Sequence, residues 1–89
     1  MPDRTRKARV EDEMFNKGLD YRDLKTKLKI PTEHIDLLFA MLGKDATNME
    51  DCEPVAERDL ARIVPTCRGM STREISRVLD SIEDRIQKF

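Results

Sequence analysis

The sequence predicts an all-α protein, a compact bundle of about five short helices that contains a helix-turn-helix-like unit. Apolar residues recur at helical spacing in several segments, and glycine or proline stands at the ends of those segments. No stretch of five or more residues alternates between apolar and polar as a half-buried strand does. We expect residues 10–89 to form a single helical domain, because a chain of 89 residues can bury one modest core.

The first nine residues carry four basic side chains and almost nothing to bury. We expect residues 1–9 to form a flexible basic arm, which is either solvated or in contact with nucleic-acid phosphates. The basic residues of this arm are Arg4, Arg6, Lys7 and Arg9.

Two short helices are predicted next. The first begins near Arg9, ends at Gly18 and has one apolar side. That side consists of Val10, Met14 and Phe15. Asp20 is expected to cap the second helix, which covers residues 21–29 and is ended by Pro31.

A third helix is expected to begin with Thr32 as its cap and to end at Gly43. Apolar residues cover most of its circumference, so we expect it to be the centre of the core. Its main stripe consists of Ile35, Leu38, Phe39 and Leu42.

The second half of the chain is predicted to hold a polar loop and two more helices. Residues 44–53 are polar and acidic and indicate the loop. Pro54 can open a helix over residues 55–64, and Pro65 would end it. Ser71 or Thr72 is expected to cap the last helix, which runs to about Lys88. Its regular stripe consists of Ile75, Val78, Leu79, Ile82 and Ile86.

Several classes of function have no signal in the sequence. There is no phosphate-binding loop or nucleophile motif, and no carboxylate pair has enough core around it to act as general acid and base. We therefore expect neither an enzyme nor a bound cofactor or metal, since His34 has no second ligand at a suitable spacing. The apolar runs are too short for a membrane. Cys52 and Cys67 are interpreted as reduced thiols of a cytoplasmic protein, with a disulfide as the alternative.

The segment from Arg68 to Glu83 carries the most information about function. It reads RGMSTREISRVLDSIE and resembles the turn and reading helix of winged helix-turn-helix transcription regulators of the MarR-like group. In that pattern a glycine turns the chain, a Ser or Thr caps the second helix, and apolar anchors follow. The resemblance covers residues 32–89 and lacks the wing, and about four extra residues precede Gly69.

The resemblance implies that the last helix enters the major groove of DNA. Short polar and arginine side chains on its outer face would then reach phosphates and base edges. The expected DNA-binding residues on this side are Arg68, Ser71, Thr72, Arg73, Ser76 and Arg77. The leading hypothesis is a small, homodimeric, DNA-binding transcription regulator, with the basic arm holding phosphates.

Two alternatives stay open. The net charge of the chain is −1, so its overall charge does not indicate a basic nucleic-acid-binding protein. The first alternative is therefore a non-enzymatic protein-interaction module that binds or inhibits a larger partner, using apolar and acidic surfaces such as residues 45–53. The second alternative concerns a repeat. The apolar spacing of the helix-turn-helix-like segment recurs 40 residues earlier, between Leu24 and Leu38, and this recurrence indicates either ordinary helical packing or a tandem module.

Overall fold

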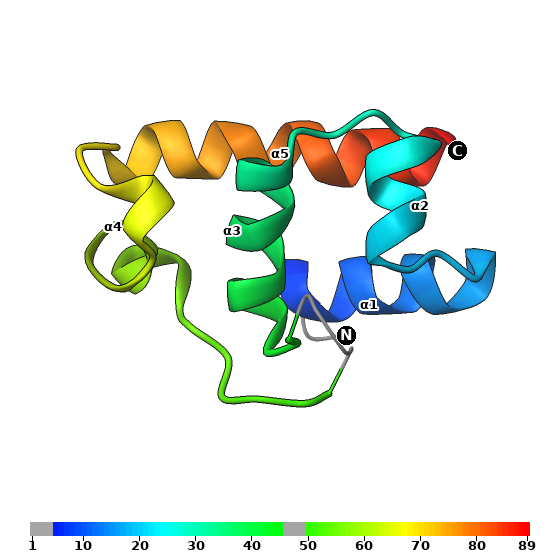
Figure 1. Ribbon diagram of the computed structural model, residues 1–89, viewed down its shortest axis with the longest axis horizontal. Helices are drawn as coiled ribbons and strands as arrows, with labels where there is room; N and C mark the ends of the chain where they lie inside the picture. Colours follow the sequence, from blue (N-terminus) through cyan, green and yellow to red (C-terminus); the bar gives the residue numbers. More distant parts are fainter. Residues whose placement is uncertain (1–4, 46–49) are drawn as a thin grey trace.

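Two long helices frame the molecule, α1 (Arg6–Lys17) and α5 (Thr72–Lys88). The computed structural model describes residues 5–45 and 50–89. In Figure 1 both helices run in the same direction along opposite edges, and α3 (Thr32–Leu42) stands across the space between them. Between these helices lie α2 (Tyr21–Thr26), the 3-10 turn η1 (Glu57–Asp59), α4 (Leu60–Ile63) and the 3-10 turn η2 (Pro65–Cys67). The described residues hold no strand, so the predicted all-α class is confirmed.

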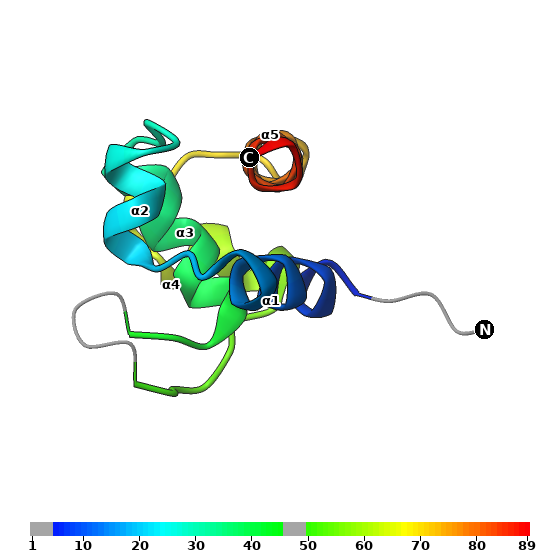
Figure 2. The same cartoon turned by 90° about the vertical axis from the view of Figure 1, so that its right-hand side faces the viewer.

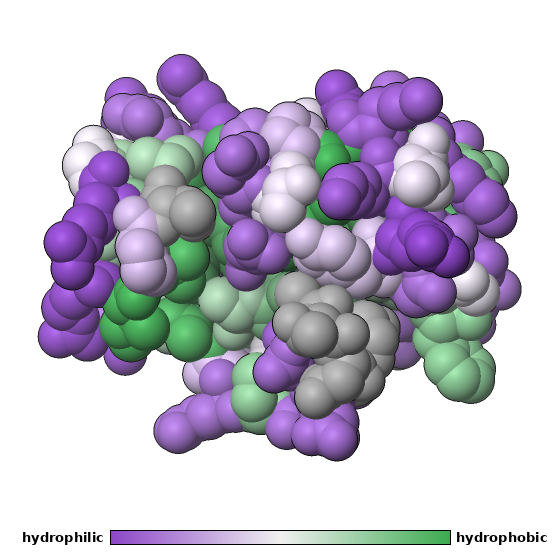
Figure 3. All heavy atoms as spheres, in the orientation of Figure 1, coloured by the Kyte–Doolittle hydropathy of each residue, from purple (hydrophilic) through white to green (hydrophobic). Residues whose placement is uncertain are grey.

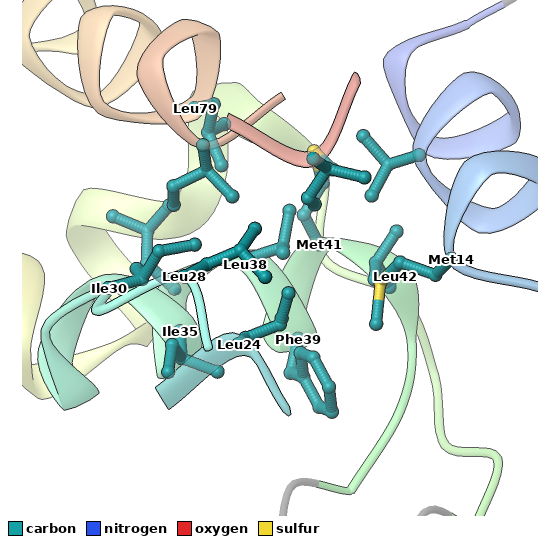
Figure 4. Close-up of a cluster of buried hydrophobic side chains, with 14 of the residues drawn as sticks. Met14, Leu24, Leu28, Ile30, Ile35, Leu38, Phe39, Met41, Leu42 and Leu79 are labelled. Carbon is teal, nitrogen blue, oxygen red and sulfur yellow. The ribbon is translucent and has the colours of Figure 1, made fainter. Parts of the chain in front are cut away.

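The helices form one core around α3. Figure 2 shows α5 nearly end-on, with α2 and α3 beside it and α1 below. Phe39 of α3 is 1 % exposed and its ring meets Tyr21 of α2 edge-on, with ring centroids 5.6 Å apart. In Figure 4, Met14 points at Leu42 from the side of α1. The stripe of α5 is buried against this centre through Ile75, Leu79, Ile82 and Ile86.

Side-chain caps fix three of the helix starts. The hydroxyl of Thr5 accepts a hydrogen bond from the backbone N–H of Ala8 at the start of α1. Asp20 begins α2 with a reciprocal capping box, and the hydroxyl of Ser71 accepts from the N–H of Glu74 in α5. The predicted caps Asp20 and Ser71 are therefore confirmed. The predicted cap Thr32 is wrong, because α3 starts from Pro31, whose carbonyl accepts the first backbone bonds and which offers no side-chain cap.

The predicted basic arm is wrong for the residues that the structure describes. α1 begins at Arg6 instead of Arg9, because the Thr5 cap starts the helix earlier. Residues 6–9 are therefore helical and belong to the folded domain, whereas Arg4 lies outside the described residues. The predicted second helix is also shorter than expected. The chain turns at Lys29 with a φ of 60°, and the N–H of Ile30 bonds back to Leu24.

The helix predicted over residues 55–64 is largely absent. The N–H of Val55 bonds to the carbonyl of Ala40 at 2.9 Å, which holds this part of the chain extended against α3. Only a 3-10 turn and the four-residue α4 follow before Pro65. Leu60 is the one fully buried side chain of α4, and Ile63 is 54 % exposed although it shares the apolar spacing.

Candidate nucleic-acid interface

The outer face of α5 presents two arginines near its N-terminal end. Ile75 and Leu79 hold the opposite face of the helix in the core, so Arg73 and Arg77 point away from it. Both arginines are exposed, and a spacing of four residues places them one turn apart on the same side. Neither forms an ion pair with any residue in the described part of the chain. Their guanidinium groups are therefore available to an external partner.

The other predicted residues of this segment lie at the same end of α5. Arg68 is exposed in the turn that leads into the helix and, within the described residues, also has no carboxylate partner. Thr72 is exposed in the first turn. Ser71 is exposed, but its hydroxyl already accepts the capping hydrogen bond from Glu74. Ser76 is half-buried on the flank of the helix.

The predicted contacts from the N-terminal arm lie elsewhere and have internal partners. The guanidinium of Arg6 reaches Glu57 at 2.7 Å and Asp80 at 2.5 Å, and its side chain is 14 % exposed. Arg9 reaches Glu83 at 2.8 Å. Lys7 pairs with Glu11 one turn further along α1. Arg6 and Arg9 therefore tie α1 to the rest of the fold, Lys7 pairs within α1, and none of the three joins the arginines at the start of α5.

The electrostatics of Arg6 confirm that its charge is held inside the fold. Burial lowers the pKa of the guanidinium, but the hydrogen bonds that Arg6 donates to Asp80 and Glu57 outweigh this effect and raise the pKa above its ordinary value. The guanidinium therefore keeps its positive charge. Its carboxylate partners also neutralise it, so it adds little to any attraction for phosphate.

One residue that the sequence analysis did not single out, Arg85, extends the arginine surface. A hollow of about 310 Å³ lies between the start of α3 and the middle of α5, and Arg77 lines it together with His34, Ser81 and Arg85. Arg85 donates to the carbonyl of Leu28 at 3.3 Å, which steadies its side chain at the rim. The sequence could have placed Arg85 on the same face as Arg77, because the two are eight residues apart and about every fourth residue of a helix returns to one face.

Other kinds of site are not formed by the described residues. No group of three or more histidine, cysteine or carboxylate side chains among them is arranged to hold a metal ion. No helix in the described part of the chain is long and apolar enough to cross a bilayer. Cys67 is buried in the core and Cys52 is exposed.

Comparisons with known proteins indicate neither a family nor a function for this chain. No protein-family model matches the chain, and no curated protein or solved structure matches it either.

Proposed function

We propose that this domain is a non-enzymatic DNA-binding protein whose contact surface is the outer face of the N-terminal half of α5. The observation that carries the proposal is the joint exposure of Arg73 and Arg77, one turn apart and with no carboxylate partner among the described residues. A helix that is fixed to the core by one face and carries arginines on the other fits the major groove of duplex DNA.

Each arginine has a distinct role in this proposal. Arg73 and Arg77 lie on the part of the helix that would enter the groove, where a guanidinium can bond to a guanine edge. Arg68 precedes the helix and Arg85 lies two turns beyond Arg77, so both suit contacts with backbone phosphates. The protein would act in the cytoplasm as a regulator of transcription with a helix-turn-helix-like unit. The single turn of α4 then replaces the full first helix of such units.

The experiment that tests the proposal is a fluorescence-anisotropy titration with a random-sequence duplex at several salt concentrations. Binding to phosphates must weaken steeply as salt rises, because counterions are released on binding. Arg73→Ala and Arg77→Ala should each weaken binding to this duplex and reduce its salt dependence, because each removes a positive charge from the surface that faces the DNA. Both should leave the melting temperature nearly unchanged, since neither side chain supports the core.

The matched control is Arg22→Ala, which removes another exposed arginine from a different helix. It should alter binding far less than Arg77→Ala does. If the wild-type protein ignores the duplex even at low salt, or if Arg77→Ala unfolds the domain, the proposal is wrong.

A second candidate function is a protein-interaction module, and a specific observation favours it. Phe15 on α1 is 86 % exposed, although an aromatic side chain of this size usually finds cover in a domain. Aromatic side chains are enriched in protein interfaces, so an exposed one is typical of a docking surface. Under this proposal the partner is a protein and the arginines of α5 serve charge complementarity.

A further inference from the structure

The hollow between the start of α3 and the middle of α5 combines apolar and basic side chains. Ile30, Val78 and Ile82 supply apolar walls, and Ile30 and Ile82 are almost completely buried. Arg77 and Arg85 line the same hollow and are exposed. Figure 3 shows mainly hydrophilic side chains along the edge that α5 forms in Figure 1, with small areas of hydrophobic surface visible between them. The volume of about 310 Å³ lies at the lower end of the range for small-molecule sites.

The positive charge of this hollow is not balanced by the fold. No carboxylate lines it, whereas three other hollows on the described part of the chain each include at least one. The side chains of Arg77 and His34 have no hydrogen-bond or ion-pair partner among the described residues. Of the carboxylates next to these positions in the sequence, Asp84 pairs with Lys88, and Glu33 is exposed and does not line the hollow. An anion in the hollow would therefore meet two guanidinium groups without a competing carboxylate.

The spacing along α5 places the hydrogen-bond donors in one column. Arg77, Ser81 and Arg85 follow one another at intervals of four residues, so the column is about 12 Å long. Arg85 is steadied by Nη1, which donates to the carbonyl of Leu28 at 3.3 Å and to that of Lys29 at 3.5 Å. Its other N–H groups remain available, and the hydroxyl of Ser81 offers a further donor between the two arginines.

The donors and the apolar walls together define a class of ligand. Guanidinium groups bind the oxygen atoms of phosphates and carboxylates with two parallel hydrogen bonds. A phosphate monoester carries nearly two negative charges at neutral pH and three acceptor oxygens, so it matches two arginines better than a carboxylate does. The apolar walls favour a hydrophobic group beside the phosphate.

We propose that the hollow between α3 and α5 binds a small phosphate monoester whose ester group is apolar. The phosphate would lie between Arg77 and Arg85 and accept a hydrogen bond from Ser81. The ester group would lie against Ile30 and Ile82. The inference goes beyond the proposed DNA binding, because the ligand is a free small molecule and because a DNA phosphate is a diester.

The first part of the test is an NMR titration of the ¹⁵N-labelled chain with phenyl phosphate at constant ionic strength and without DNA. Backbone amide signals of the residues that line the hollow should shift and saturate, with a dissociation constant of about 1 mM for a ligand of this size. Inorganic phosphate lacks the apolar group and benzyl alcohol lacks the charge, so each should bind about tenfold more weakly or less. The proposal is overturned if no signal shifts up to about 10 mM, or if the shifts spread over all basic side chains.

A second titration distinguishes a monoester from the phosphate of a nucleic-acid backbone. Methyl phenyl phosphate keeps the ring but is a diester and carries a single negative charge. It should bind about tenfold more weakly than phenyl phosphate, because two arginines attract the second charge of the monoester. Equal binding of the two compounds would overturn the assignment of a monoester and would indicate a backbone phosphate instead.

The third part uses variants of α5. Arg77→Gln should weaken the binding of phenyl phosphate by about tenfold, because a charge-assisted contact is lost. Arg73→Gln is the matched control, since it removes the same charge one turn earlier from a residue outside the hollow, and it should change the dissociation constant little. Ser81→Leu keeps every charge but puts a larger side chain into the hollow, so it should also weaken binding.

Equal losses in Arg77→Gln and Arg73→Gln would overturn the proposal, because they would indicate a general attraction to a basic helix. Unchanged binding in Ser81→Leu would also overturn it, because the hollow would then not be the site. The three substituted side chains are exposed, so the folds should be retained, and circular dichroism checks this. Because no DNA is present, the result stands or falls separately from the DNA titration.

Discussion

Arg6 and Glu83, which are 77 residues apart in the sequence, form an ion pair that joins the first helix to the last. Their side chains are only 14 % and 12 % exposed. Glu83 also accepts from Arg9, and Arg6 also donates to Asp80 and Glu57. Loss of Arg6 would leave Glu83 with Arg9 and would take this partner from Glu57, in a network that is partly shielded from water.

Arg6→Ala should therefore lower the free energy of unfolding by about 1–3 kcal/mol, measured by urea denaturation. Lys7→Ala is the control, because Lys7 forms an exposed pair with Glu11 within one helix. Such pairs contribute about 0–1 kcal/mol. Equal losses in the two variants would contradict the importance of the Arg6 network.

Phe39→Ala and Leu79→Ala should lower the free energy of unfolding by about 3–5 and 2–5 kcal/mol respectively. Both side chains are fully buried, so each truncation removes apolar contacts and leaves a cavity. Phe15→Ala provides the contrast, because the same truncation at an 86 % exposed position leaves no cavity. Its midpoint in urea should stay close to that of the wild type.

Gly43→Ala should destabilise the domain more than Gly18→Ala. Both glycines have positive φ, 76° and 64°, which costs an L-residue about 1–2 kcal/mol. At Gly43 an added Cβ would also lie 2.8 Å from the carbonyl oxygen of Cys52, whereas nothing lies within 4 Å at Gly18. Thermal melting of the two variants measures the difference, and a smaller loss at Gly43 would mean that the returning chain is not held at that place.

Asp36→Asn should stabilise the domain at neutral pH. Burial, and then the nearby charge of Glu33, raise the pKa of the Asp36 carboxyl above its ordinary value. The folded state therefore favours the protonated acid, and ionisation above the folded-state pKa costs stability. The gain in melting temperature should be complete above that pKa and should vanish below the ordinary value of 3.8, where the acid is protonated in both states.

The control for this titration is Asp84→Asn, because Asp84 forms an exposed pair with Lys88. Its melting temperature should differ little from that of the wild type at any pH. A loss of stability in Asp36→Asn at pH 7 would show that the ionised carboxylate is stabilising instead.

The sequence predicted those parts of the fold that local chemistry controls. The Ser71 cap and the stripe through Leu79 gave α5 nearly its true length, and the apolar residues around Phe39 identified α3 as the central helix. Arg73 and Arg77 could be placed on the outer face, because a regular stripe fixes which residues lie opposite it.

The remaining features depend on contacts between distant segments. Spacing shows which residues share a face, but not whether another element covers that face. Phe15 was therefore expected on the apolar side of the first helix and is exposed, and Ile63 is exposed although it shares the apolar spacing of its segment. The partners of Arg6 lie on η1 and α5, which the sequence does not place beside α1. The shortened α4 results from the bond between Val55 and Ala40, a pairing that no local pattern indicates.

The pairing of α1 with α5 also sets the order in which the chain can complete its fold during synthesis. α1 is made well before α5, because Glu83 follows its partner Arg6 by 77 residues and the carbonyl of Ile86, which accepts from Lys17, follows that lysine by 69 residues. Contacts so distant in sequence close late and carry a large loop-closure cost. The nascent chain therefore exposes the inner faces of α1 and α3 until α5 has been made, and α5 then covers them.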